Sequence, residues 1–231
     1  FQFAPTARSR AALLAEGVPV EHIHLTGNTV VDAQQWACTH HGVKRRVQGL
    51  GHLLVTVHRR ENWGNDVAEI CHAIADISTL YPQLDILFPV HLNPVIQVPV
   101  HEILGGCPKV RLVPPLAYLE MQQALADAWM VLTDSGGLQE EAPTFGVPVL
   151  VLRDETERPE AIDAGCAVIV GAQRRNIVDE VKRLAGDATA FARMQRAGNP
   201  FGDGEASQRI LTTLAQHFEA MHVAHSHLTS V

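Results

Sequence analysis

Short apolar runs alternate with stretches of helical periodicity through the middle of the chain. The apolar runs predict strands at residues 52–57, 84–90, 109–113, 128–133, 147–152 and 166–171. The stretches between them predict helices, among them 65–80, 95–104 and 117–128. Short apolar strands that alternate with helices are typical of βαβ units, which build a parallel sheet covered by helices on both faces. The pattern therefore predicts an α/β fold.

The two ends of the chain fall outside this alternation. A helix at 6–16, a short strand at 22–26 and a helix at 28–41 come first, and an amphipathic helix at 205–220 comes last. The segment "NPFGDG" (199–204) supplies Pro, Gly and Asp, which are typical of a chain that crosses between domains. We expect helix 205–220 to pack its apolar face on residues 6–16 or on another chain, and not within the core of the sheet domain.

Polar segments follow consecutive strands of the predicted sheet. They read "HRREN" (58–62), "HLNP" (91–94), "PPLAY" (114–118), "DSGG" (134–137) and "RDETERPEA" (153–161). In open parallel sheets, ligands bind beyond the carboxyl ends of the strands, where the strand order reverses. We therefore expect these segments to form one rim, and their His, Arg and Gly residues indicate an anionic ligand of nucleotide size.

The segment Ser135-Gly136-Gly137 has two interpretations. A strand that ends in small residues and opens into a helix presents free backbone N–H groups, which bind phosphate. The same residues are also compatible with a plain tight turn, since the segment lacks the glycine spacing of the dinucleotide fingerprint and the lysine of a Walker loop. The sequence pattern alone leaves both interpretations open.

The charged residues of the rim also have alternatives. Glu140 and Glu141 are expected in the first turn of a helix, where they either complement its macrodipole or, for one of them, accept from a ribose diol. Arg158 either pairs with a neighbouring glutamate, Glu155 or Glu157, or faces the ligand. The run that starts at His58 places three potential cations beyond one strand, and they need an anion or carboxylates nearby.

Composition excludes several classes of function. The 231 residues carry 18 basic and 25 acidic side chains, a net charge of −7, without a long basic run, so we expect no nucleic-acid partner. No apolar stretch approaches the roughly 18 residues of a membrane helix, and no secretory signal is visible. The four cysteines are scattered, which favours a reducing, cytoplasmic location. The chain begins at Phe1 and not at a start methionine, and we expect it to be part of a longer protein.

Histidine clusters suggest metal binding, but their spacing does not support it. The clusters are His22/His24, His40/His41 and the tail "HVAHSH" (222–227), and none has the spacing of a closed zinc site with cysteines. The segment "HEILG" (101–105) lacks the second histidine of a zincin. No nucleophile-elbow pattern for a Ser-His-Asp system is present. We therefore expect no metal.

Several long motifs resemble one enzyme family. The segments "TVHRRENWG", "PVHLNP", "LTDSGGLQEEAP", "PVLVLRDETERPEA" and "NPFGDGEAS" are similar to the non-hydrolysing bacterial UDP-N-acetylglucosamine 2-epimerases, and the match runs through nearly the whole chain. The resemblance implies a Rossmann-like parallel sheet with helices on both faces, the second domain of a two-domain, glycosyltransferase-B-like architecture. It also implies three parts: residues 1–27 end the first domain and connect it, 28–200 form the UDP-binding domain, and 201–231 are a helix that crosses back, with a tail.

The resemblance assigns roles to the rim residues. Ser135, Gly136 and Gly137 correspond to the residues that hold the diphosphate, and Glu141 to the ligand of the ribose hydroxyls. Arg158 corresponds to a nucleotide-binding arginine, and His58 to the active-site histidine that interacts with the leaving diphosphate.

Other corresponding positions concern the base and a second site. The family contacts uracil from the segment after the third strand, where this chain has Leu116 and Met121 in place of the Gln and Phe of relatives. Backbone recognition of the base would survive that change. Arg59 and His91 resemble residues that contact a second, activating UDP-sugar in some members.

The implied reaction interconverts UDP-N-acetylglucosamine and UDP-N-acetylmannosamine. UDP leaves C1 while a proton leaves C2, and UDP returns after the proton has been delivered to the opposite face. The route needs no cofactor. The family resemblance also implies a homodimer at full length and a cytoplasmic role in cell-surface polysaccharide biosynthesis, and it places the acid and base carboxylates in the amino-terminal half, which this chain does not contain.

Two other functions share part of the pattern. The nucleotide half of a UDP-sugar glycosyltransferase can look the same, although "HRREN" and "DETERPEA" favour the epimerase. A non-catalytic UDP-sugar-binding module is the other alternative. An acceptor-dependent transfer assay separates the first from an epimerase, and binding without turnover at full length would support the second.

Overall fold

The computed structural model describes residues 1–46 and 50–228, with the side chains of the last helix described as far as Glu219. It divides into two compact units. The larger unit is Ala37–Pro200, and the smaller one joins Phe1–Trp36 to the chain from Phe201 onward. The domain limits 1–27, 28–200 and 201–231 stay a prediction.

The larger unit is built on a parallel sheet of six strands in the order β5-β4-β3-β6-β7-β8. The strands are β3 (His52–Thr56), β4 (Ile86–Pro89), β5 (Val110–Val113), β6 (Ala128–Thr133), β7 (Val149–Val151) and β8 (Ala167–Ile169). Each falls within one of the predicted runs, so the α/β prediction is confirmed. The runs were detectable because both faces of the sheet are covered and the central strands are apolar at nearly every position.

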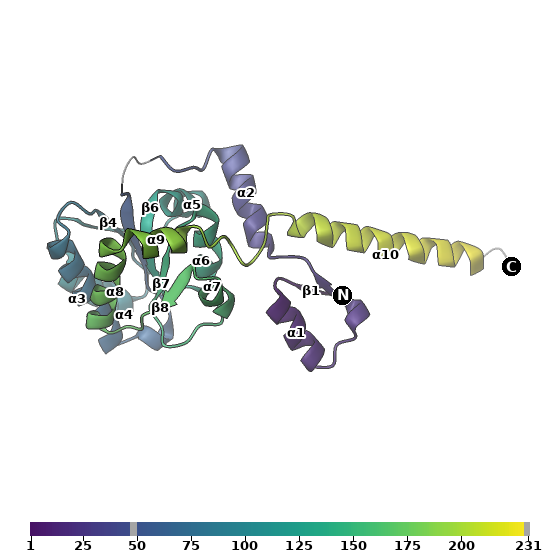
Figure 1. The fold of residues 1–231 in the computed structure, drawn as a ribbon, viewed down its shortest axis with the longest axis horizontal. Coiled ribbons are helices and arrows are strands. Elements are labelled where there is room, and N and C mark those ends of the chain that lie inside the picture. The colour runs from purple at the N-terminus through teal and green to yellow at the C-terminus, as the bar shows by residue number, and fades with distance from the viewer. Residues whose placement is uncertain (47–49, 229–231) are drawn as a thin grey trace. The chain divides into compact units, whose positions relative to one another are not determined.

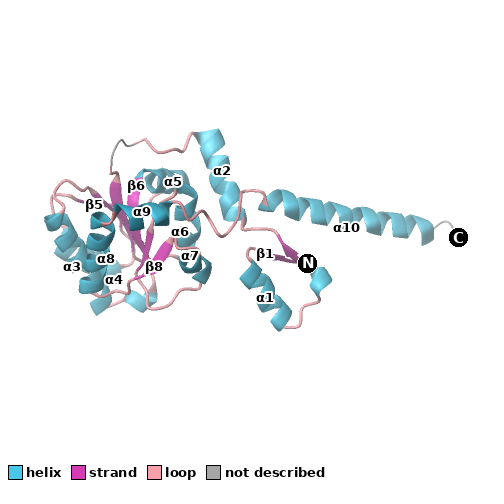
Figure 2. Ribbon diagram, viewed as in Figure 1, coloured by secondary structure: helices cyan, strands magenta, loops and turns pink. Residues whose placement is uncertain are grey.

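Helices cover both faces of the sheet. They are α3 (Asn65–Leu80), α4 (Pro94–Leu104), α5 (Tyr118–Asp127), α6 (Gly136–Glu141), α7 (Pro159–Asp163), α8 (Arg174–Gly186) and α9 (Ala188–Gln195), with short 3₁₀ turns η2 (Arg60–Asn62) and η3 (Ala142–Phe145). Figure 2 shows α3, α4 and α8 on one side of the strands and α5, α6 and α7 on the other. The helices on both faces confirm the predicted Rossmann-like arrangement.

The core forms where apolar helix faces meet the strands. In α3, Val67, Ile70, Ile74 and Ile77 recur at helical spacing and are fully or almost fully buried. They join Phe88 of β4 and several apolar residues of β3 and β6, among them Leu53 and Met130, in one cluster. Burial of such side chains contributes roughly 1.5–3 kcal/mol each, so this cluster holds the sheet that supports the rim.

The strand order reverses between β3 and β6. The chain runs outward from β3 through β4 to β5, then crosses through α5 to β6 and continues outward on the other side. Thr56 and Thr133 end these two central strands, and their hydroxyl groups form a buried hydrogen bond of 2.6 Å. The loops that follow β3 and β6 therefore leave the sheet side by side and in opposite directions, which is the usual position of a ligand crevice.

The smaller unit contains β1 (Gln2–Ala4), α1 (Ala7–Ala15), the 3₁₀ turn η1 (Val20–His22), β2 (Ile23–Leu25) and α10 (Ala206–Leu228). Helix α2 (Thr29–His41) begins in this unit and ends in the larger one (Figure 1). Strand β1, which pairs with β2 in parallel, was not predicted, because three residues are too few to show a period.

The amino end of α10 is fixed by Asp32 of α2. Its carboxylate accepts hydrogen bonds from the N–H groups of Ala206 and Ser207, at 3.2 and 2.7 Å. Further along α10, Leu211 and Phe218 are 61% and 58% exposed. That face is therefore not buried in a core, and its expected partner stays a prediction.

Candidate functional site

A pocket of about 330 Å³ opens beyond the carboxyl ends of β3 and β6. Its lining comes entirely from the larger unit and consists of Thr56, His58, Leu116, Tyr118, Met121, Ser135, Gly137, Leu138 and Glu141. Six of the residues predicted for the site, His58, Leu116, Met121, Ser135, Gly137 and Glu141, are thus brought together. Thr56, Tyr118 and Leu138 were not predicted.

His58 lies against a buried carboxylate. Its Nδ1 is 3.0 Å from Oδ1 of Asp134, which has no exposed surface. Asp134 also accepts from the backbone N–H groups of His58 and Arg59 and from Nδ2 of Asn62. Burial alone would raise the pKa of Asp134, but the hydrogen bonds from His58 and from these N–H groups outweigh it, and the pKa is lowered. Asp134 is therefore a carboxylate at neutral pH.

Two glycines follow Ser135 at the start of α6. Ser135 is the N-cap of α6, and its Oγ accepts from Leu138 N–H at 3.4 Å. Neither Gly136 nor Gly137 has a positive φ, so their backbone does not require glycine. A Cβ at Gly137 would lie 3.7 Å from the Ser135 Oγ, an ordinary contact. Gly136 is buried, whereas Gly137 is half-buried and lines the pocket, so the missing side chain at Gly137 leaves backbone open to a ligand.

Two arginines flank Gly136. A Cβ at Gly136 would lie 3.5 Å from Nη2 of Arg59 and 3.7 Å from the guanidinium carbon of Arg158. Among the described residues, the buried Nε of Arg59 has no hydrogen-bond partner. Arg158 forms an ion pair through Nε with Glu140. The sequence suggested Glu155 or Glu157 as the partner of Arg158. The partner is Glu140 instead, because α6 places Glu140 next to the guanidinium group.

Glu141 lies across the pocket from His58. It occupies the last position of α6, so the expectation that Glu140 and Glu141 lie in the first turn of a helix was wrong. The helix begins at Gly136 and is only six residues long, and the macrodipole explanation fails with it. Oε2 of Glu141 accepts from Nε2 of the fully buried Gln122 at 2.5 Å. Burial raises the pKa of Glu141, with a smaller contribution from Glu140.

The remaining wall of the pocket is largely apolar. Leu116 precedes α5, and Met121 lies on its first turns beside Tyr118, whose side chain is 44% exposed. Burial raises the pKa of Tyr118, and Glu141 adds to the shift. Tyr118 could have been found from the sequence, because it closes the rim segment "PPLAY" and is the aromatic residue there.

His91 does not line the pocket, but its ring stacks near that of His58. The ring centroids are 6.2 Å apart and the planes differ by 29°. His91 belongs to the loop after β4, the strand beside β3. The two histidines predicted from separate segments are therefore neighbours at one end of the site.

A buried arginine joins the loops on two sides of the site. Arg153 lies 2.8 Å from Glu61 in the loop after β3 and 2.5 Å from Glu157 in the loop after β7. The pair with Arg153 lowers the pKa of Glu157 to about 2. Thr156 donates to Gln139 of α6 and accepts from the N–H of Arg158. These contacts hold Arg158 toward α6.

Two negative findings concern the described part of the chain. Within residues 1–46 and 50–219, no group of three or more His, Cys, Asp or Glu side chains could hold a metal ion, and the histidines of the tail (222–227) lie outside these residues. No helix in the same residues is long and apolar enough to span a membrane.

The sequence of the chain matches one family of known proteins. The family model described as UDP-N-acetylglucosamine 2-epimerase matches residues 1–215. Among curated relatives, the UDP-N-acetylglucosamine 2-epimerase of Yersinia pestis is 45% identical over 94% of this chain and 61% of its own length. That of Escherichia coli K12 is 46% identical over 93% of this chain and 60% of its own length. The chain thus spans about 60% of the relatives it matches.

Solved structures agree with this grouping. The crystal structure of the Neisseria meningitidis UDP-GlcNAc 2-epimerase bound to UDP-GlcNAc has a TM-score of 0.87 and 37% identity, and covers 93% of this chain and 61% of that one. The Methanocaldococcus jannaschii enzyme in complex with UDP-GlcNAc and UDP has a TM-score of 0.77 and 30% identity, with coverage of 93% and 60%. The chain belongs to the UDP-N-acetylglucosamine 2-epimerase family.

Proposed function

We propose that this chain is the nucleotide-binding half of an enzyme that interconverts UDP-N-acetylglucosamine and UDP-N-acetylmannosamine. One observation carries the proposal. The pocket joins a carboxylate, Glu141, to the bare backbone at Gly137, and the guanidinium groups of Arg59 and Arg158 lie beside the neighbouring Gly136. A ribose diol and a diphosphate need those two environments next to each other.

Each part of UDP then has a partner. The diphosphate lies on Ser135, Gly136 and Gly137, and Arg158 neutralises its charge. Glu141 accepts from the ribose hydroxyls, held by Gln122 in one orientation. Uracil lies against Leu116 and Met121. The carboxylate of Glu141 and the phosphates are both anionic, so the arginines are needed to make the site attractive to the whole nucleotide.

The chemistry depends on the departure of UDP from C1. As the C1–O bond breaks, its electron pair goes to the β-phosphate, while the C2–H bond supplies the electron pair of the new double bond and its proton goes to a base. Negative charge therefore develops on the diphosphate. Groups fixed in advance around that charge lower the barrier, and His58 and Arg158 are those groups here. This accounts for a cationic rim around the phosphate site and requires no cofactor.

The proposal also covers the substrate and the cellular setting. The Neisseria meningitidis and Methanocaldococcus jannaschii structures hold UDP-GlcNAc, and we propose the same substrate here. We also propose a homodimer at full length, a cytoplasmic location and a role in cell-surface polysaccharide synthesis. Arg59 and His91 as contacts of a second, activating UDP-sugar remain part of this proposal.

Calorimetry with UDP and with inorganic phosphate tests the ribose and phosphate assignments separately. Glu141→Ala removes only the ribose contact, so UDP should weaken by about tenfold or more while phosphate changes little, since a hydrogen bond to a charged group is worth roughly 1.5–3 kcal/mol. Glu102→Ala, on the exposed side of α4, is the matched control and should change neither affinity. Equal losses for UDP and phosphate would contradict the ribose assignment, and no binding of UDP to the unaltered chain would contradict the function.

A further inference from the structure

Asp134 is the one buried carboxylate at the base of the site, and the roles assigned above do not use it. It has no exposed surface, and its side chain contacts groups of the β3 loop. A buried carboxylate is costly unless it is hydrogen-bonded on both oxygens. Oδ1 accepts from His58, and Oδ2 accepts from Arg59 N–H and Asn62 at 2.8 and 3.0 Å. In the described residues, the ring of His58 is the only titratable side chain within ion-pair distance of it.

The geometry decides which nitrogen of His58 faces the ligand. Nδ1 lies 3.0 Å from Oδ1 of a carboxylate, which only accepts hydrogen bonds, so Nδ1 must carry the hydrogen. The two ring nitrogens point in divergent directions, so Nε2 points away from Asp134. The His58 side chain is 38% exposed and lines the pocket. Nε2 is therefore the nitrogen available to a ligand.

We propose that Asp134 is the positioning residue of His58, which fixes Nδ1 as the protonated nitrogen and presents Nε2 to the diphosphate. This deepens the proposed function and rests on it. In the neutral ring, Nε2 carries a lone pair and would repel a phosphate oxygen. The ring must therefore take up a proton at Nε2 when UDP binds, and it then donates on both sides, to Asp134 and to the diphosphate. The other charged or titratable groups facing this region are Arg59, His91, Tyr118, Glu141 and Arg158.

The tautomer of His58 is measured directly by ¹⁵N NMR of histidine-labelled chain. His58→Gln identifies the signals of His58 among the 13 histidines. When the ring of His58 is neutral, the free chain should show hydrogen on Nδ1 and none on Nε2. Saturation with UDP should bring hydrogen to both nitrogens. Hydrogen on Nε2 and none on Nδ1 in the free chain would overturn the proposal, as would a bare Nε2 in the UDP complex. This measurement needs no substitution at Asp134, so it stands even if a variant there does not fold.

A double-mutant cycle separates positioning from mere support of the loop. Asp134→Asn places an amide against several donors and should weaken UDP by about tenfold or more, because the ring loses its fixed tautomer. In the His58→Gln background, the same change should cost at least about threefold less, since residues that act through one another are not additive. A loss that differs by less than this factor between the two backgrounds would overturn the proposal.

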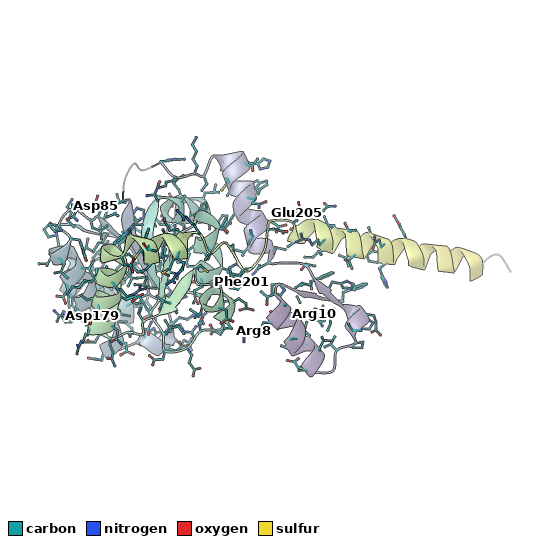
Figure 3. All side chains as sticks on the ribbon, in the orientation of Figure 1. Arg8, Arg10, Asp85, Asp179, Phe201 and Glu205 are labelled. Carbon is teal, nitrogen blue, oxygen red and sulfur yellow. The ribbon has the colours of Figure 1, made fainter. Side chains whose placement is uncertain are left out.

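A matched control excludes a general effect of charge. Asp85→Asn also removes one carboxylate, but Asp85 (Figure 3) is exposed, pairs with Lys109 and precedes β4, at the opposite end of the sheet. It should leave UDP affinity and the His58 tautomer unchanged. If the unaltered chain does not bind UDP, the proposed function fails, whereas the tautomer of the free ring still tests what Asp134 does.

Discussion

Arg158 and Glu140 form an ion pair that joins the loop after β7 to the end of α6. Arg158 uses Nε for this pair, and its Nη1 donates to the backbone carbonyl of Glu157 at 3.1 Å. A guanidinium group has five N–H donors in a fixed fork, so it can hold Glu140 and still offer donors to a diphosphate. A lysine has one ammonium group, which cannot serve both sides with the same geometry.

We therefore expect Arg158→Lys to weaken UDP by about tenfold or more although the charge is kept. Arg175→Lys is the matched control, because Arg175 pairs with Asp179 on the exposed face of α8 (Asp179 is labelled in Figure 3). Titration calorimetry measures the affinity of both variants for UDP. Wild-type affinity in Arg158→Lys would mean that only the charge of this residue matters.

The glycines of α6 should separate stability from binding. Gly136→Ala and Gly137→Ala introduce a methyl group that meets only ordinary contacts, so the free energy of unfolding should stay the same or rise by up to about 1 kcal/mol. The methyl group at Gly137 occupies the pocket wall, and the one at Gly136 lies against the guanidinium groups of Arg59 and Arg158, so UDP affinity should fall by about tenfold or more. Denaturant unfolding and calorimetry give the two values. Gly186→Ala, at the end of α8, is the control and should leave UDP affinity unchanged. An alanine variant that binds UDP normally would contradict the assignment.

Glu141 should make the fold less stable at neutral pH. Its folded-state pKa is raised above the ordinary value of 4.5, mainly by burial, so ionisation is more costly in the folded state than in the unfolded one. Stability is therefore lost as the pH rises from about 4.5 through the raised pKa. We expect Glu141→Gln to have a higher melting temperature than the wild type at about pH 7 and no advantage at about pH 4. The same variant should bind UDP more weakly. An equal gain in melting temperature at both pH values would mean that the variant is stabilised by packing and not by the loss of the charge.

The 231 residues alone should bind UDP without catalysing epimerisation. Among the residues that line the pocket, Glu141 is the only carboxylate, and it is assigned to the ribose. Exchange at C2 needs a base on one face of the sugar and an acid on the other, and loss of such groups typically costs about 10²–10⁴-fold. The purified chain is incubated with UDP-N-acetylglucosamine in deuterated water, and C2 is followed by NMR. Deuterium uptake as fast as in a full-length relative would place an acid and a base in this chain and refute the assignment.

The fold of the larger unit could be predicted because its buried strands appear in the sequence as short, continuous apolar runs. Strand β6 is buried at all of its positions, and its predicted limits, 128–133, agree with the structure. Strand β1 could not be predicted, since it is short and mostly not buried. Helix α6 was placed too late along the chain, because glycines are poor helix formers and the sequence gave no sign that the helix begins on them.

The site was predictable in its outline and not in its connections. His58 and Ser135 stand just after β3 and β6, and Glu141 ends the short helix that follows β6, so these positions can be read from the chain. The partner of Arg158 depends on how the loop after β7 packs against α6, and a local sequence pattern does not show this. Gln122 and Asp134 were not singled out either, because a buried polar residue looks like a surface residue until its environment is known.

The contacts of Arg153 have a consequence for the entropy of binding. Arg153 ties Glu61, in the loop that carries His58, to Glu157, in the loop that carries Arg158. The two loops cannot vary their separation freely while both pairs are formed. Little conformational freedom is then left to lose when a ligand bridges the loops, and a larger share of the interaction energy appears as affinity. The same ion pairs make the two loops move together as one rigid body. Any closure over a bound sugar must therefore come from movement outside these two loops.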